Sequence, residues 1–431
     1  MRACHPGNRS CRNCAALSGD DTHRSDGVDA LQDIGQRIAR ARRRRGLSQS
    51  VLAGLIGRSE SWLSQVERGQ RSVDSHSVIK AMGEILGLAA DDLTTTRTDA
   101  MTHYQAASAI RHAMMGYDGL SSLIDPRQAE GSPESFVWLR HEIRQVNRLY
   151  QSTQYDEVGK RLPGLIIATE LGSRHAPADR RRTYQTLRSL TYHCATTTLR
   201  RVGESDLAWL AADRSLAAAE EAERPLLAAV SAYRLSYVFV RLREPGKALH
   251  LVLRAADALH RSPRHAGPRS LSMLGALYLV AVTAAAAQYD QAAVRTFLAQ
   301  ARQAAERIGE DRNDFWTAFG STNVTIHEVS AATESGDARQ AIAKAETLDV
   351  GNLAPGLVGR RAQVHLDLAR AYAVQRKDAA SVNTLLAAER LSPELVRYGG
   401  RTRDLLTQLL KREHRASTPQ LRGLATRAGI A

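Results

Sequence analysis

The sequence contains few cysteines and few aromatic residues. Of its 431 residues, four are cysteine and 5% are aromatic. Three cysteines fall within the first 14 residues and Cys194 stands alone, which excludes a network of disulfides across the fold. The 43% hydrophobic content is dominated by alanine and leucine, a composition that favours packed helices over β-sandwiches. We therefore predict an all-α protein.

A long apolar run of the kind that crosses a membrane is also missing. The longest apolar stretch, residues 271–287, is shorter than a typical span and rich in alanine, serine and threonine. The basic N-terminus is not followed by the apolar segment of a secretory signal. We expect no membrane contact and a cytoplasmic protein.

Residues 1–30 lack apolar periodicity and are rich in glycine, serine, aspartate, arginine and histidine, which predicts a disordered tail. Cys4, His5, Cys11 and Cys14 could be combined into a four-ligand zinc site with C-x-x-C spacing. A closed zinc site, however, normally takes its ligands from ordered elements. We therefore predict no metal here, with zinc as the alternative.

The charge is one-sided. Lysine and arginine total 59 against 45 acidic residues, a formal net charge of +14. About half of that excess lies between residues 34 and 72, where nine arginines face two glutamates. A basic block of this density indicates an anionic partner, and nucleic acid is the first expectation.

Within this block the sequence predicts two short helices joined by a tight turn. Ser48 and Ser59 are suited to cap the two helices, and Gly57 can adopt the positive φ of the turn between them. Gly69 ends the second helix. The spacing of a small residue, a turn glycine and two apolar anchors suits two helices that cross steeply: Gln49, Ala53, Gly57, Leu63 and Val66.

The segment GLSQSVLAGLIGRSESWLSQVERGQRS resembles the Cro-like helix-turn-helix domain of the XRE family, over residues 31–93. The resemblance implies a five-helix DNA-binding domain and an internal ion pair between Arg42 and Glu67. Val73 stands where the family often has proline, and Arg58 replaces a more usual apolar residue. Neither change breaks the expected geometry, because Asp74 or Ser75 can still cap the following helix.

If the second of these helices enters the major groove, its exposed turns present the residues that contact bases. Gln49 should bond a phosphate and brace that helix, while Arg68 and Arg71 supply attraction that does not depend on sequence. Trp62 is left out, because an aromatic residue at its position more often packs against the domain. The predicted DNA-binding residues are Gln49, Ser59, Glu60, Ser61, Ser64, Gln65, Arg68 and Arg71.

Residues 94–100 form a polar linker, and residues 101–431 alternate helical segments with short breaks. A phrase recurs every 40 to 50 residues, at the expected start of the second helix of a pair. The small residue at its end should let that helix pack closely against its partner. The copies are TQYDEV, GESDLA, REPGKA, AQYDQA, GDARQA and KDAASV, ending at Val158, Ala208, Ala248, Ala292, Ala341 and Val382.

The array resembles the tetratricopeptide repeat, with longer periods than usual, and the alternative is an irregular helical domain. The resemblance implies a superhelix whose first helices line a concave groove. Basic clusters 180–182 and 200–201 are interpreted as solvated surface. Polar and aromatic residues that could contact a ligand are Tyr184, Tyr192, Tyr233, Tyr237, Tyr278, Asn323 and His327, although most of the tyrosines are expected in the core.

The sequence contains no phosphate-binding loop, nucleophile elbow, dinucleotide fingerprint or paired-histidine zinc motif, so we expect no enzyme and no cofactor. The prediction is a sequence-specific regulator, as in bacterial (actinobacterial-type) regulators, that binds double-stranded DNA as a homodimer. Its repeat domain would sense a peptide, small molecule or protein partner. The alternatives are an interaction scaffold that uses the helix-turn-helix only for tethering and, more weakly, an antitoxin-like repressor.

Overall fold

The computed structural model describes residues 45–71, 76–86, 104–116, 135–261, 267–414 and 416–430, with Gly35, Ile38, Ala39, 41–43 and Val73 besides. The chain divides into two compact units, Met1–Met101 and Thr102–Ala431. Every regular element of the described residues is a helix, so the predicted all-α class is confirmed. The predicted tail (1–30), with Cys4, Cys11 and Cys14, and the predicted linker (94–100) lie outside the described residues.

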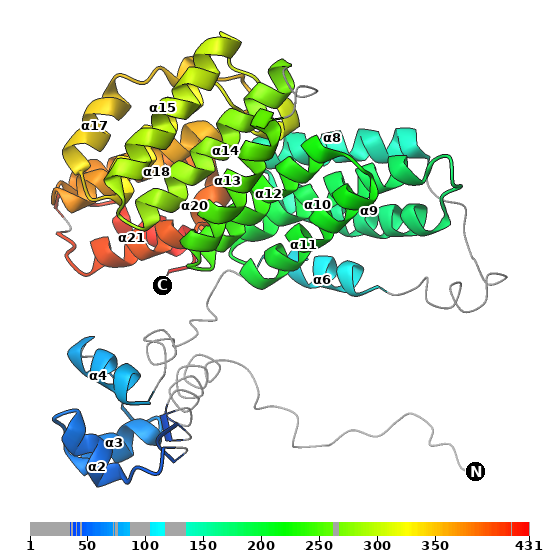
Figure 1. Ribbon diagram of the computed structural model, residues 1–431. Helices are drawn as coiled ribbons and strands as arrows, with labels where there is room; N and C mark the ends of the chain where they lie inside the picture. Colours follow the sequence, from blue (N-terminus) through cyan, green and yellow to red (C-terminus); the bar gives the residue numbers. More distant parts are fainter. Residues whose placement is uncertain are drawn as a thin grey trace, which may run out of the picture. The chain divides into compact units, whose positions relative to one another are not determined.

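In the N-terminal unit, helix α2 (Gln49–Leu55), helix α3 (Glu60–Glu67) and helix α4 (His76–Leu86) surround a small core (Figure 1). The Ser48 and Ser59 hydroxyls accept hydrogen bonds from the third residue of each following helix, at 3.1 and 3.2 Å. Gly57 has a φ of 66° in the turn. Both predicted caps and the predicted turn are therefore present. Of the five predicted helices, the other two fall on residues that are described incompletely or not at all.

The second unit is a series of antiparallel helix pairs in which each helix contacts its partner (Figure 1). Residues at the end of the chain and before the first pair add further helices: α6 (Ala106–Met115), α20 (Pro393–Tyr398), α21 (Gly400–Leu410) and α22 (Leu421–Arg427). The pairs are α8 (Phe136–Gln151) with α9 (Tyr155–His175), α10 (Arg181–Val202) with α11 (Ser205–Glu221), α12 (Pro225–Arg241) with α13 (Pro245–Arg261), α14 (Pro268–Ala287) with α15 (Gln291–Ile308), α16 (Ser321–Glu334) with α17 (Ala338–Glu346), and α18 (Val358–Val374) with α19 (Asp378–Leu391).

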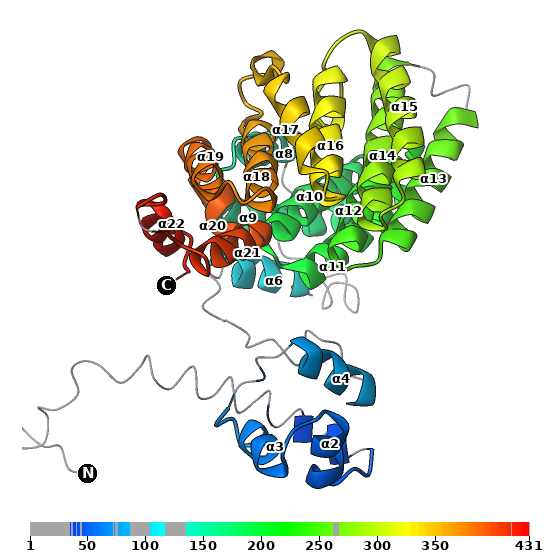
Figure 2. The same ribbon diagram turned by 90° about the vertical axis from the view of Figure 1, so that its left-hand side faces the viewer.

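The first helices of the pairs form a closed inner ring. Each of α8, α10, α12, α14, α16 and α18 contacts the next one in this order, and α18 returns to contact α8. Figure 2 shows the pairs fanned side by side along the array. The predicted helical repeat array is confirmed, and its ends meet because the array curves through a full circuit.

The same turn joins the two helices of every pair. Its central residue is left-handed: Gly203 and Gly336 supply glycine, whereas Thr153, Arg243, Tyr289 and Arg376 adopt φ between 59° and 63°. The next residue then donates its backbone N–H to the carbonyl five positions earlier, as in Gln154 to Leu149 and Asp290 to Ala285. This bond satisfies a carbonyl that the helix end would otherwise leave without a partner.

Counting from these turns corrects one of the six sequence phrases, the one that ends at Ala292. The residue five positions after the left-handed one is buried in all six pairs: Val158, Ala208, Ala248, Val294, Ala341 and Ser381. The prediction that Ala292 packs against the partner helix is wrong, because Ala292 is exposed and Val294 takes that place. In the last pair Ser381 takes it, with Val382 buried beside it.

Among the described helices, α14 alone is long and apolar enough to span a membrane, and 72% of its apolar window is buried inside the fold. It contacts α12, α13, α15 and α16. Its apolar character is thus accounted for by its neighbours in the array. Gly275 lies in its middle, where an added Cβ would be 1.9 Å from the ring of Phe319.

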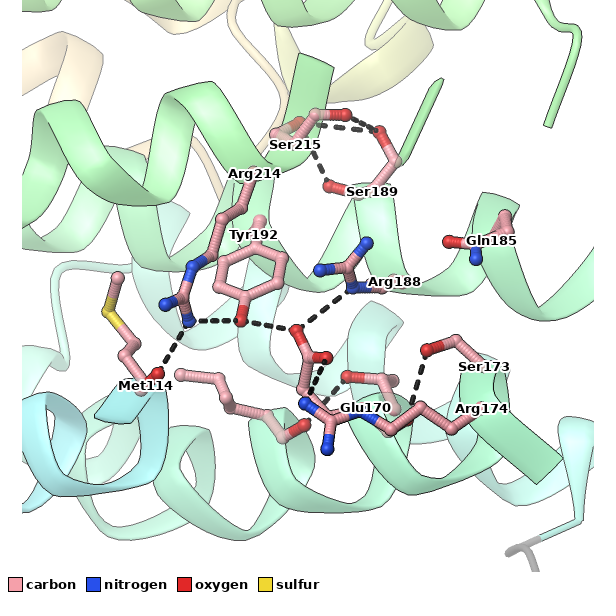
Figure 3. Close-up of polar contacts among 12 residues, drawn as sticks. Met114, Glu170, Ser173, Arg174, Gln185, Arg188, Ser189, Tyr192, Arg214 and Ser215 are labelled. Atoms are coloured by element: carbon pink, nitrogen blue, oxygen red, sulfur yellow. Dashed lines mark hydrogen bonds and ion pairs between the residues drawn. The ribbon is translucent and has the colours of Figure 1, made fainter. Parts of the chain in front are cut away.

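A polar cluster fastens α6 to the start of the array (Figure 3). The Arg214 guanidinium donates to the carbonyl of Met114 at 2.6 Å and to the Tyr192 hydroxyl at 3.1 Å. Tyr192 in turn donates to Glu170 at 2.6 Å, and Arg188 pairs with the same carboxylate oxygen at 2.9 Å. Four helices, α6, α9, α10 and α11, are therefore joined by one chain of charge-assisted bonds.

We predict that Gly275→Ala destabilises the second unit by about 1–3 kcal/mol, because the new methyl group must displace the Phe319 ring. Urea unfolding followed by circular dichroism measures the change. The control is Gly164→Ala in α9, where an added Cβ meets nothing within 4 Å. That variant should be neutral or more stable by up to about 1 kcal/mol. Equal stabilities for the two variants would contradict the tight contact.

Candidate nucleic-acid interface and ligand cavity

Helix α3 presents the predicted base-contacting residues on its outer face. Glu60 and Ser61 are exposed in its first turn, and Ser64 and Gln65 are half-buried one turn later. The opposite face carries Leu63 and Val66 into the core, with 0% and 2% of their surfaces exposed. A short helix with one face in the core and one polar face outward has the form that a recognition helix requires.

The flanks of α3 hold the remaining predicted contacts. Ser59 is exposed, and its hydroxyl caps the helix by accepting the N–H of Trp62. Arg68 and Arg71 are exposed at and beyond the other end, where Arg68 Nε donates to the carbonyl of Ser64 at 3.1 Å.

A buried ion pair holds α3 in place. Arg42 Nε and one amino group donate to the two carboxylate oxygens of Glu67 at 2.6 and 2.9 Å, a bidentate contact. A second amino group of Arg42 donates to the carbonyl of Leu47 at 2.7 Å. Arg42 and Glu67, the pair implied by the family resemblance, are thus in direct contact and nearly inaccessible to solvent.

Gln49 joins the same carboxylate. Its side-chain amide donates to Glu67 Oε2 at 2.7 Å, which braces α2 against α3. Burial raises the pKa of the Glu67 carboxyl, but the hydrogen bonds from Arg42 and Gln49 and the charge of Arg42 lower it further, so the net shift is downward. Glu67 is therefore held in its charged form.

Trp62 packs beside this core and is half-buried. The guanidinium of Arg58 lies over its ring, 5.6 Å from the centroid. The position of Trp62 matches its omission from the predicted contacts. It also gives Arg58 a packing role for which the sequence offered no signal.

Inside the ring of first helices lies a cavity of about 810 Å³. Side chains from all six first helices line it, with further contributions from the α9 start, the segment around Trp316 and helix α21. Its volume falls in the range of sites for small molecules and short peptides, which is about 300–1,000 Å³. The predicted concave groove is therefore present as a partly open cavity.

Of the seven residues considered for ligand contact, Tyr233, Tyr237 and His327 line this cavity. Tyr192 is fully buried in the polar cluster around Glu170. The four that do not line the cavity are Tyr184, Tyr192, Tyr278 and Asn323.

The interpretation of Arg200 and Arg201 as solvated surface is wrong. Both line the cavity. The Arg200 guanidinium lies over the ring of Tyr237, 5.1 Å from the centroid, and Arg201 donates to Gln363 Oε1 at 3.2 Å. Sequence periodicity could not reveal this, because it separates buried from exposed faces and not an inner groove from an outer surface.

The analysis of the sequence missed Arg234 and Arg360, which also line the cavity. Arg234 is 5% exposed and donates one amino N–H to the carbonyl of Phe315 at 2.8 Å. Arg360 donates to the carbonyl of Thr317. Arg234 stands alone in an ordinary helical pattern and Arg360 is followed by Arg361, so no local signal marked either as facing a cavity.

Tyr237 and His327 fix each other's hydrogen bonds. His327 Nδ1 lies 2.9 Å from the carbonyl of Asn323, which can only accept, so Nδ1 carries the proton. The Tyr237 hydroxyl then donates to Nε2 at 3.1 Å. Burial, with the charge of Arg360, lowers the pKa of His327 to about 3, so the imidazole is neutral near pH 7.

Residues 33–95 match the family model of a helix-turn-helix domain. No curated protein matches the chain. Among solved structures, the crystal structure of Bacillus thuringiensis PlcR in complex with the peptide PapR7 and DNA is similar over 84% of this chain and 99% of that chain. The identity is 12% and the TM-score 0.27. The family match confirms the helix-turn-helix domain that the sequence motif predicted.

We predict that Arg42→Met lowers the stability of the N-terminal unit by about 3–5 kcal/mol, because Glu67 would remain buried without its partner. Hydrogen exchange of peptides from α2 and α3, measured in the full chain at increasing urea concentrations, gives the unfolding free energy of this unit. Arg43→Met, which removes an exposed charge from the neighbouring residue, is the control and should change it by less than about 1 kcal/mol.

The same pair makes stability depend on pH. The pKa of Glu67 in the folded protein lies below its ordinary value of 4.5. The contribution of the charged Glu67 to the free energy of unfolding is therefore complete above pH 4.5 and is lost as the pH falls through the folded pKa. The difference in unfolding free energy between the wild type and Arg42→Met should therefore become smaller as the pH is lowered. A difference that stays constant from neutral to acid pH would show that the ion pair does not stabilise the unit.

Proposed function

We propose that this protein is a cytoplasmic, sequence-specific transcriptional regulator that binds double-stranded DNA as a homodimer and whose helical array senses a ligand. The observation that carries the proposal is the outer face of α3. Glu60 and Ser61 are exposed there, while the Arg42–Glu67–Gln49 contacts hold the helix rigidly from behind. A recognition surface must be fixed in this way, because base contacts fail when the side chains are displaced by about 1 Å.

The roles within that surface follow from side-chain chemistry. Gln65 can bond an adenine edge with the oxygen and the NH2 of its side-chain amide, and Glu60 can accept from the amino group of cytosine. Ser59, Ser61 and Ser64 are short enough to bond bases or phosphates, whereas Arg68 and Arg71 contribute attraction independent of sequence. Gln49 is already engaged with Glu67, so its assigned role is bracing α3, with a phosphate contact beside it.

Dimerisation supports specificity. A single small domain that recognises one half-site is seldom selective enough among the many sites of a genome. A second copy held at a fixed spacing doubles the number of base contacts. The large helical array is the part of the chain with surface available for that association and for a ligand.

The ligand-sensing part of the proposal rests on the cavity. It lies inside the ring of first helices and is lined by tyrosines and arginines from several pairs. A ligand that contacts several first helices at once favours one curvature of the array over another. The competing proposal, an interaction scaffold with a tethering helix-turn-helix, shares the array but needs no sequence preference in DNA binding.

We predict that selection of random DNA fragments by the full-length protein enriches a paired motif with half-sites one or more helical turns apart. The variant Glu60→Ala, Ser61→Ala, Gln65→Ala should lose that enrichment while weak, salt-sensitive binding persists, because each base contact contributes about 1–3 kcal/mol of discrimination. Binding at two salt concentrations completes the test.

Two controls separate the roles. Arg71→Ala should keep the motif, weaken binding to all sequences and reduce the salt dependence by about one counterion. Glu84→Ala changes an exposed acid on α4 and should leave both properties unaltered. Salt-sensitive binding with no enriched motif in the wild-type protein would refute sequence-specific regulation and favour the scaffold.

A further inference from the structure

The cavity of the second unit carries more positive charge than its own carboxylates neutralise. Eight arginines line it, against three acidic residues. Two of those acids are already engaged: Glu334 pairs with Arg370 and Arg401 at 3.1 and 3.0 Å, and Asp367 pairs with Arg370 at 3.6 Å. Four of the other arginines stand outside these ion pairs, although the side chain of Gln363 connects Asp367 with one of them, Arg201.

These four are Arg200 and Arg201 of α10, Arg234 of α12 and Arg360 of α18. Within the part of the chain that the structure describes, none of the four forms an ion pair with a carboxylate. Their contacts are the rings of Tyr237 and Tyr233, the Tyr150 hydroxyl, a side-chain amide and backbone carbonyls. Such neutral acceptors offset little of the cost of removing a guanidinium from water.

Two of these side chains also keep a buried N–H without a partner. Among the described residues, the Nε atoms of Arg201 and Arg234 are inaccessible to water and make no hydrogen bond. Arg234 as a whole is 5% exposed. Buried polar groups are almost always satisfied, so unpartnered donors on two charged side chains at one cavity point to a missing acceptor.

Tyr150 lies among the four arginines and shows that their charges converge. It stands on α8, which contacts both α10 and α18 in the ring. Burial alone raises the pKa of a phenol, yet the charges of Arg201, Arg200, Arg234 and Arg360 shift the pKa of Tyr150 downward overall. A negative charge at this hydroxyl is thus stabilised by all four guanidinium groups at once.

We infer that the cavity binds a compact anion whose carboxylate or phosphate group lies among Arg200, Arg201, Arg234 and Arg360. Guanidinium groups match these anions in a planar, two-point geometry. The rest of the ligand would lie against Tyr233, Tyr237 and Trp316, which line the same space. The inference rests on the proposed function, which assigns a ligand to this cavity, and it adds the ligand's charge and the residues that select it.

The test uses the full-length protein and pairs of probes that differ only in charge, at constant ionic strength. One pair is a nucleoside monophosphate with its nucleoside, and the other is a short peptide with a free C-terminal carboxylate or a C-terminal amide. Inorganic phosphate serves as the bare anion. Calorimetric titration and thermal unfolding measure binding. Comparison of the two pairs shows whether the cavity prefers a phosphate or a carboxylate ligand.

At least one anionic probe should bind about tenfold or more tightly than its neutral partner, because hydrogen bonds to a charged group exceed those to a neutral one. Arg200→Gln and Arg360→Gln should each remove about tenfold or more of that affinity. Arg200→Lys keeps the charge and should retain part of it. Arg254→Gln, which removes an exposed guanidinium from α13 outside the cavity, is the matched control and should bind as the wild type does.

Unfolding without any probe shows whether each variant is folded, and both chosen arginines are only half-buried. Equal binding of charged and neutral partners, absence of binding by every anion, or unchanged affinity in the two glutamine variants would overturn the inference. Repeating the DNA selection with the bound anion separates the proposals. An anion that binds through these arginines without altering DNA binding leaves the inference standing and refutes ligand sensing.

Discussion

The architecture of the second unit depends on one backbone constraint, the left-handed residue that ends the first helix of every pair. The hydrogen bond after it closes the helix end, as between Asp290 and Ala285, and sends the chain back along the same axis. The fifth residue beyond then falls in the interface between the two helices, where Ala208 and Val294 are buried. Six such turns bring α18 back to α8, and the cavity is the space that this circuit encloses.

The sequence predicts the fold of the first unit more closely than that of the second, because local signals mark the helix ends in one and are mostly missing in the other. In the helix-turn-helix, Ser48, Ser59 and Gly57 are local signals with specific chemistry, so helix ends and the turn could be placed closely. In the array, four of six turns place threonine, arginine or tyrosine at positive φ, where glycine would have given the signal. The array was predictable from its alanine and leucine periodicity, but Ala292 was assigned to an interface that Val294 occupies.

The two candidate sites also differ in how far the sequence could predict them. The Arg42–Glu67 contact could be expected because the resemblance to a known family implied it, whereas the cavity arginines come from three helices of different pairs. Helical spacing places Arg200 and Arg201 on a face without revealing that the array folds that face inward. The composition shows an excess of arginine, but only the ring of first helices shows that some of these arginines line a cavity.

The two buried charge clusters also differ in what they require. Glu67 satisfies Arg42 with both oxygens, so the pair is complete within the chain and holds α2 and α3 rigidly. Arg234 has no such acid, and among the described residues its buried Nε–H has no hydrogen-bond partner. An anion bridging α10, α12 and α18 would therefore stabilise the closed circuit relative to an opened one, since only the closed form brings the arginines together. Differential affinity of this kind is the condition for a ligand to shift a conformational equilibrium.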